Sequence, residues 1–163
     1  MAAGATYTPI ASTTIGTAVA SYTFSSISGS YTDLRLVIVA DDGGTQSYVA
    51  IRLNGDSAGN YSRTTLYGDG SSAGSYRGSN ETYIYCTGLD DSFRGNIEAD
   101  FMNYSNATTY KTVLMRGNNT TTTRAKVALW RATPAAITSI AIYAGSGNFA
   151  VGSTFALYGI AAA

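Results

Sequence analysis

The sequence contains no histidine and one cysteine, Cys86. Histidine is the most frequent general base and a frequent metal ligand, so Ser-His-Asp and Cys-His catalytic arrangements are excluded. A single cysteine cannot form an intrachain disulfide. Cys86 ends the run Tyr83-Ile84-Tyr85-Cys86, and nothing near it in sequence would lower the thiol pKa. We therefore expect it to pack as a small hydrophobe rather than to react.

Charge is also scarce. Charged residues make up 12% of the 163 residues, ten basic and ten acidic, for a net charge of zero. A typical domain has about 25%. With no basic run, we expect no binding to nucleic acid. A neutral surface lacks the repulsion that keeps copies apart, so we expect self-association, as a dimer or trimer.

Long apolar runs are absent as well. No run approaches the roughly 20 residues of a membrane-spanning helix, so we expect no contact with a membrane. The first residues, MAAGATYTPIAS, have neither the basic region nor the long apolar region of a signal peptide. Apolar residues nevertheless reach 45%, enough for one sizeable core.

The apolar residues that are present alternate with polar ones in short runs separated by turn residues, and no long window has the 3.6-residue helical period. Such spacing predicts an all-β, antiparallel two-sheet β-sandwich, jelly-roll-like, with about ten strands. We expect a single domain over residues 1–163. The expected strands are Val19–Phe24, Asp33–Ala40, Gln46–Asn54, Arg63–Tyr67, Thr82–Thr87, Asn96–Tyr104, Tyr110–Arg116, Arg124–Arg131, Ile137–Ala144 and Ser153–Ile160.

Local details follow from turn residues. Asp41-Asp42-Gly43-Gly44 predicts a hairpin between Asp33–Ala40 and Gln46–Asn54. The stretch Gly68–Asn80 is small and polar, and we expect a long loop there. Residues 1–12 are expected to form an extended N-terminal arm, at a sheet edge or outside the sheet, because Pro9 cannot donate to a ladder.

The last expected strand shows its faces clearly. Between Ser153 and Ile160, Phe155 and Leu157 point one way, and Ala156, Tyr158 and Ile160 point the other. Both faces should be at least partly covered.

Carboxylates are the remaining candidates for chemistry. Glu98 and Asp100 share one face of a strand and could serve a glycosidase. We favour a structural interpretation, in which they are balanced by Arg94 or by an arginine of a neighbouring strand. Asp90 and Asp91 are expected in a loop.

Two groups of turn residues could in principle hold calcium. Asp41-Asp42 and Asn54-Gly55-Asp56 match no complete calcium loop and should cap turns. The glycine-rich stretch Gly68–Gly78 lacks the Lys-Ser/Thr ending of a phosphate-binding loop. We expect no catalytic residue, no metal and no cofactor.

Several segments carry a resemblance to a known group of proteins. They are TYTPIASTTIG, SYTDLRLVI, NYSRTTLYGDGSSAGSYRGSN, MNYSNATTYKTVLMRGN, ALWRATPAAITSIAIY and the terminal GNFAVGSTFALYGI. The chain resembles small structural proteins of tailed-bacteriophage virions, over almost its whole length. Members of such families occur as capsid decoration (cement) proteins and as tail-fibre or head-fibre domains. The resemblance implies no catalytic residue.

Two functions are then open. In the first, the protein decorates the capsid surface of the virion, contacts the major capsid protein and stabilises neighbouring subunits. In the second, it is a receptor-binding fibre domain that recognises a host surface glycan. A weaker third alternative is a glycan-cleaving enzyme using Glu98 and Asp100. Our interface candidates, from the arm and the expected long loop, are Tyr7, Pro9, Ile10, Tyr76 and Arg77.

Overall fold

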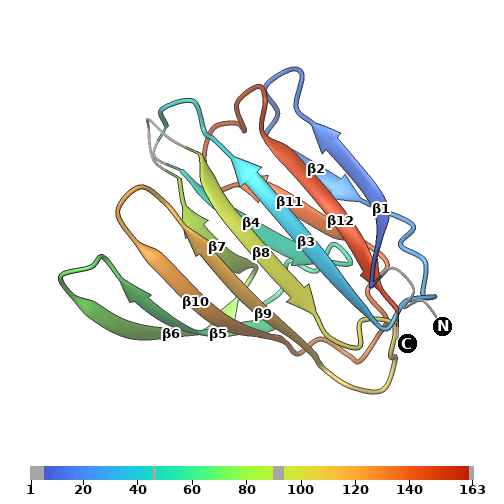
Figure 1. The fold of residues 1–163 in the computed structure, drawn as a ribbon. Helices are drawn as coiled ribbons and strands as arrows, with labels where there is room; N and C mark the ends of the chain where they lie inside the picture. The colour runs from blue at the N-terminus through green and yellow to red at the C-terminus, as the bar shows by residue number, and fades with distance from the viewer. Residues whose placement is uncertain (1–5, 46, 90–93, 162–163) are drawn as a thin grey trace.

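The computed structural model describes residues 6–45, 47–89 and 94–161, and over these residues it contains twelve β-strands and no helix. The predicted all-β, antiparallel, jelly-roll-like sandwich of two sheets is confirmed (Figure 1). The strands are β1 (Tyr7–Thr14), β2 (Ser21–Phe24), β3 (Asp33–Ala40), β4 (Tyr48–Leu53), β5 (Tyr61–Gly68), β6 (Ala73–Glu81), β7 (Ile84–Gly88), β8 (Gly95–Phe101), β9 (Lys111–Asn118), β10 (Thr123–Trp130), β11 (Ile140–Ala144) and β12 (Thr154–Ile160).

The two sheets differ in width. The large sheet has eight strands in the order β1-β12-β3-β8-β9-β10-β5-β6, and the small sheet has four in the order β2-β11-β4-β7. Because one sheet has twice as many strands, part of its inner face extends beyond the other. The β5–β6 hairpin projects at that side of the molecule (Figure 1). We call the β10-β5-β6 part of the large sheet the wing.

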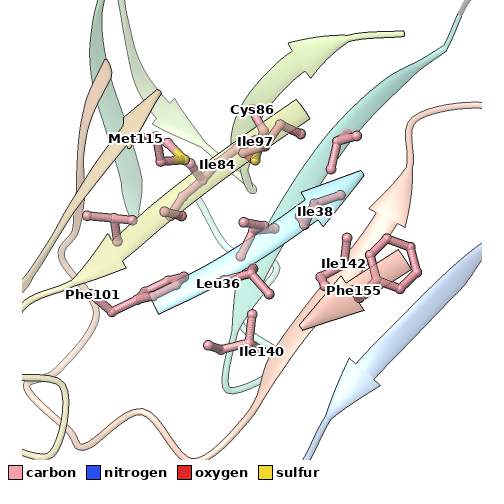
Figure 2. Packing of buried hydrophobic residues seen from close by; sticks show 14 of the residues in the cluster. Leu36, Ile38, Ile84, Cys86, Ile97, Phe101, Met115, Ile140, Ile142 and Phe155 are labelled. Carbon is pink, nitrogen blue, oxygen red and sulfur yellow. The ribbon is translucent and has the colours of Figure 1, made fainter. Parts of the chain in front are cut away.

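The core lies between the sheets, where the alternation of the strands directs apolar side chains inward. Leu36 and Ile38 from β3 are fully buried and face the interior together with Ile140 and Ile142 from β11 (Figure 2). Burying one such side chain stabilises the fold by roughly 1.5–3 kcal/mol. The packing of these two strands therefore holds the two sheets together.

The alternation in β12 is as predicted. Phe155 and Leu157 are buried, whereas Ala156, Tyr158 and Ile160 are partly exposed on the other face. The strand is flanked on both sides, by β1 and by β3.

The expected hairpin between Asp33–Ala40 and Gln46–Asn54 is wrong. β3 lies in the large sheet between β12 and β8, and β4 lies in the small sheet between β11 and β7. The connection instead carries the chain from one sheet to the other, and it is held by the buried Asp42. The Asp42 carboxylate accepts hydrogen bonds from the backbone N–H groups of Gly44 and Ser47. Gln46, inside the expected strand, lies outside the described residues.

The expected long loop Gly68–Asn80 is also wrong, because most of it forms strand β6. The turn before β6 is short, and the exposed Asp69 carboxylate caps it by accepting hydrogen bonds from the backbone of Ser71 and Ser72. β6 pairs with β5 along its length. Small polar residues suffice here because an edge strand of the wing has little core to fill.

The N-terminal segment belongs to the sheet from Tyr7 onward. β1 is an edge strand paired with β12, and its register shifts between Pro9 and Ala11. This agrees with an edge position for Pro9, since a bulge on an edge strand tolerates the missing N–H. Residues 1–5 of the expected arm lie outside the described residues.

One end of the interior is polar, under the wing. Lys126 of β10 is 2% exposed, and its Nζ donates hydrogen bonds to the backbone oxygens of Tyr85 and Cys86, the latter at 2.8 Å. Nζ also lies 4.6 Å from the centre of the Tyr85 ring. Desolvation lowers the pKa of the Lys126 ammonium to about 8. Arg63 of β5 lies over the same ring and pairs with Glu81 at 3.0 Å.

Candidate functional site

The outer face of the large sheet is the surface that gathers the candidate residues. Strand alternation places on it the side chains opposite those of the core, from β3, β8, β9 and β10. Several shallow hollows, of about 180 to 520 Å³, are lined by residues of this face. Four parts of it differ in chemistry: a charge-compensated centre, an aromatic end, an apolar patch and a cationic end.

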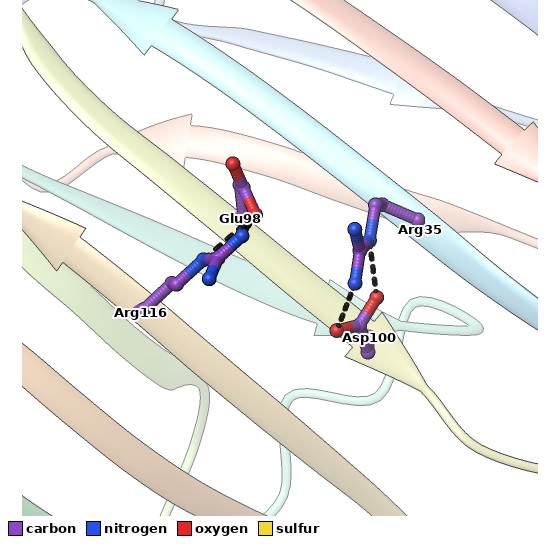
Figure 3. Close-up of polar contacts among 4 residues, drawn as sticks. All are labelled: Arg35, Glu98, Asp100 and Arg116. Atoms are coloured by element: carbon purple, nitrogen blue, oxygen red, sulfur yellow. Dashed lines mark hydrogen bonds and ion pairs between the residues drawn. The ribbon is translucent and has the colours of Figure 1, made fainter.

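The centre contains both carboxylates of the suggested glycosidase pair, and each is held by an arginine of an adjacent strand (Figure 3). Arg35 donates to Asp100 through Nε at 2.6 Å and Nη2 at 2.8 Å. Arg116 donates to Glu98 through Nε at 2.8 Å and through Nη2. The hydrogen bond that Arg35 donates to Asp100 is the main cause of a raised pKa for the Arg35 guanidinium. Each carboxylate of the suggested pair therefore already has an arginine partner on an adjacent strand.

The sequence suggested two alternatives for the arginines that balance Glu98 and Asp100, and the structure shows one of them. The expected balance by an arginine of a neighbouring strand is confirmed, whereas Arg94 makes no ion pair within the described residues. Its guanidinium donates instead to the backbone oxygens of Val151 and Gly152. Asp90 and Asp91 lie outside the described residues.

The aromatic end lies at strands β1 and β12. Tyr7 and Tyr158 meet edge to face, with ring centres 6.5 Å apart, and the Arg35 guanidinium lies 5.1 Å from the centre of the Tyr7 ring. These residues, with Val37 and Glu98, line a hollow of about 330 Å³. Tyr7 is 43% exposed, so part of its ring is accessible to solvent.

Apolar side chains cross the middle of this face toward the wing. Leu66, Leu114 and Val127 come from three adjacent strands and are 60%, 49% and 47% exposed. Leu114 and Val127 are directly paired across β9 and β10, and Ala125 is paired with Leu66. We call Leu66, Leu114, Ala125 and Val127 the apolar patch. Exposed apolar residues that are contiguous in this way are typical of binding surfaces.

The cationic end lies on the wing, where Arg77 of β6 and Arg131, just after β10, line a hollow of about 520 Å³. The hollow has a hydroxyl rim formed by Ser62, Thr64 and Ser79. Both arginines are exposed.

The predicted interface residues do not come together. Tyr7, Pro9 and Ile10 lie on β1, and Tyr76 and Arg77 lie on β6, which are the opposite edges of the large sheet. Tyr7 and Pro9 are exposed, whereas Ile10 packs against the core.

The two β6 candidates also differ from expectation. Tyr76 is half-buried rather than in a loop, with its ring 5.8 Å from that of Tyr67 and under the Arg63 guanidinium. Arg77 is exposed on the outer face, opposite Thr64. Tyr158, Arg131 and the apolar patch were not identified from the sequence. The alternation of the patch residues is visible in the sequence, but the sequence does not show that these residues point outward.

Other candidates for chemistry have structural roles, as expected. Cys86 is a buried free thiol, and burial raises its pKa to about 12. Asp41 caps its turn by accepting from the Gly43 N–H at 2.9 Å. Asp56 accepts from the Ala58 N–H at 2.9 Å and from Trp130 Nε1 at 2.6 Å.

Among the described residues, no group of three acidic, cysteine or histidine side chains could hold a metal ion. No helix long and apolar enough to cross a membrane occurs in the described ranges.

Comparison with known proteins gives a limited result. No protein-family model matches the chain, and no curated protein matches it. A solved exo-inulinase from Aspergillus awamori aligns over 94% of this chain and 29% of its own, with 14% identity and a TM-score of 0.49. The LG1-3 region of the laminin α2 chain aligns over 82% of this chain and 25% of its own, with 13% identity and a TM-score of 0.28. The chain thus spans under a third of the length of either.

Proposed function

We propose that this protein is a structural component of a bacteriophage virion, a capsid decoration protein that binds the outside of the shell and stabilises contacts between neighbouring capsid subunits. The resemblance of its segments to such virion proteins supports the assignment to the particle. The observation that carries the adhesive role is the outer face of the large sheet, with its exposed apolar patch beside carboxylates already neutralised by arginines. We also propose that the chain catalyses no reaction.

Binding through the face of a sheet requires no conformational change. An interface of about 800 Å² per partner is typical of a specific complex. A decoration protein that touches several capsid subunits gains occupancy because the second contact forms at high effective concentration. The edge strands β1 and β6 each pair on one side within the described chain and could add contacts by strand addition.

The proposal is tested by adding purified protein to shells that lack it. We expect saturable binding at hundreds of copies per particle, and a higher temperature of shell disruption. The double variant Leu66→Asp, Val127→Asp should remain folded, because both side chains are exposed, but it should lose binding. The matched control is Val151→Asp, since Val151 is 59% exposed and lies outside the strands of the large sheet. Normal decoration by the double variant would contradict a role for this face.

Self-association is a second part of the proposal. We expect a dimer or trimer, because the neutral chain carries an exposed apolar surface. Analytical ultracentrifugation of the free protein measures this directly. A monomer at all concentrations would contradict self-association of the free protein.

A fibre domain that binds a host glycan is the alternative, and the aromatic end favours it. An exposed tyrosine ring beside an arginine and a carboxylate can stack on a sugar and hydrogen-bond its hydroxyls. Copy number separates the two functions, because a fibre is present in a few to a few dozen copies. Binding of host-surface glycans that is lost in Tyr7→Ala, together with low copy number, would replace the decoration function by this one.

A further inference from the structure

The cationic hollow of the wing differs from the rest of the outer face in charge. In the centre, Arg35 and Arg116 are each neutralised by a carboxylate of a neighbouring strand. Arg77 and Arg131 make no ion pair with any described residue, and no acidic residue lines their hollow. Among the described residues, the Arg131 side chain makes one long hydrogen bond, from Nη2 to Asn80 Oδ1 at 3.4 Å. The chain has no net charge, so this local excess comes from the placement of charges alone.

The floor and rim of the hollow indicate what could fill it. Its floor is apolar, formed by the exposed Val127 and the half-buried Leu129. Its rim carries hydroxyl groups of adjacent strands, among them Thr64, which is paired directly with Arg77. Such a site offers guanidinium groups to carboxylates, hydroxyls to a backbone, and an apolar surface to an aliphatic side chain.

We propose that this hollow binds an extended acidic segment of a partner protein, with carboxylates on Arg77 and Arg131 and an aliphatic side chain over Val127 and Leu129. The inference rests on the proposed function in one respect, because it takes the partner to be a subunit of the capsid shell. It adds the chemistry by which that partner is recognised.

Two other classes of anionic partner fit the hollow less well. Nucleic acid is bound through many phosphate contacts, whereas this surface has two unpaired arginines. Carbohydrate is commonly bound by stacking on an aromatic ring, and none lines this hollow. Binding of a peptide requires neither many phosphate contacts nor an aromatic ring for stacking.

The test uses the full chain and a fluorescein-labelled peptide of alternating glutamate and valine, followed by fluorescence polarisation. Peptides with glutamine or lysine in place of glutamate are the charge controls, and an alginate oligomer is the carbohydrate control. We expect binding of the glutamate peptide alone, weakened as salt screens the exposed charges.

Variants of the two arginines assign the binding to the hollow. Arg77→Ala and Arg131→Ala should each weaken binding about tenfold, which corresponds to about 1.4 kcal/mol. Arg77→Lys should recover part of the loss, because lysine keeps the charge without the bidentate geometry. The matched control is Arg116→Ala, an exposed arginine of the same face that is already paired with Glu98. It should leave binding unchanged.

Each other result overturns the inference. Failure of the glutamate peptide to bind, equal binding of the glutamine peptide, preference for alginate, or an equal loss in Arg116→Ala would each do so. Shell binding is then measured separately with the Arg77→Ala, Arg131→Ala double variant. Peptide binding without shell binding by the wild type would contradict the proposed function alone. Undiminished shell binding by the double variant would contradict the inference alone.

Discussion

Lys126 makes the stability of this protein depend on pH in an unusual direction. Desolvation lowers the pKa of its ammonium in the folded state to about 8, from 10.5. Between these values the unfolded chain binds more protons than the folded one, so the free energy of unfolding rises with pH. Below the lower value both states are protonated, and the fold bears the full cost of the buried charge.

The size of the effect follows from the two pKa values. One unit of pKa difference corresponds to about 1.36 kcal/mol. Integrating proton binding between about pH 7 and about pH 9.5 gives an increase of roughly 2 kcal/mol in the free energy of unfolding. Cys86 acts in the opposite direction above about pH 9, because burial raises its thiol pKa to about 12.

The variant Lys126→Met isolates the contribution of the ammonium. It keeps the aliphatic volume and removes the charge, and it leaves the backbone oxygens of Tyr85 and Cys86 without this donor. Urea unfolding of both proteins at the two pH values gives four free energies, and the same comparison in a Cys86→Ala background removes the thiol, whose pKa Lys126 lowers. We expect the wild type to gain about 2 kcal/mol relative to the variant as pH rises. Equal pH dependence in the two proteins would refute the assignment of the low pKa to Lys126.

Two further changes test the packing. Asp56→Ala removes the acceptor of the Trp130 indole N–H and should cost about 1.5–3 kcal/mol at neutral pH, measured by tryptophan fluorescence during urea unfolding. Burial raises the Asp56 pKa, but hydrogen bonds, first among them that from Trp130, lower it by more, so the folded-state pKa lies below its ordinary value. This stabilisation should therefore be lost as pH falls through the folded-state pKa, and an unchanged dependence of the free energy of unfolding on acidic pH would contradict it. Gly159→Ala should cost about 1–3 kcal/mol, because its Cβ would lie 2.3 Å from the Tyr31 ring. Gly16→Ala, with nothing within 4 Å of the new Cβ, is the control, and equal losses would contradict the packing argument.

Much of the local structure could be predicted from sequence because a two-residue period fixes which side chains share a face. The bounds of β3 and the inward face of β12 follow from that period alone. Pairing between distant strands could not be predicted. β3 pairs with β12 and β8, which are far from it in sequence, and turn residues after β3 gave a misleading local signal.

The candidate site was less predictable, for a physical reason visible in β10. Its buried face contains Lys126, while its exposed face contains Val127, so polarity alone assigns neither face. For the same reason, polarity does not show that the side chains of the apolar patch point outward. Arg77 was identified as a candidate, but its placement in a loop was wrong, because pairing with β5 rather than core packing makes β6 a strand.

The unequal width of the two sheets separates structural from functional constraint within one domain. Residues over the small sheet must keep their volume, because each fills space between two rigid layers. The outward side chains of the wing fill no such space, and the main chains of β5 and β6 pair along the hairpin. The partner preference that we propose for the wing can therefore change residue by residue, while the sandwich that carries it stays the same.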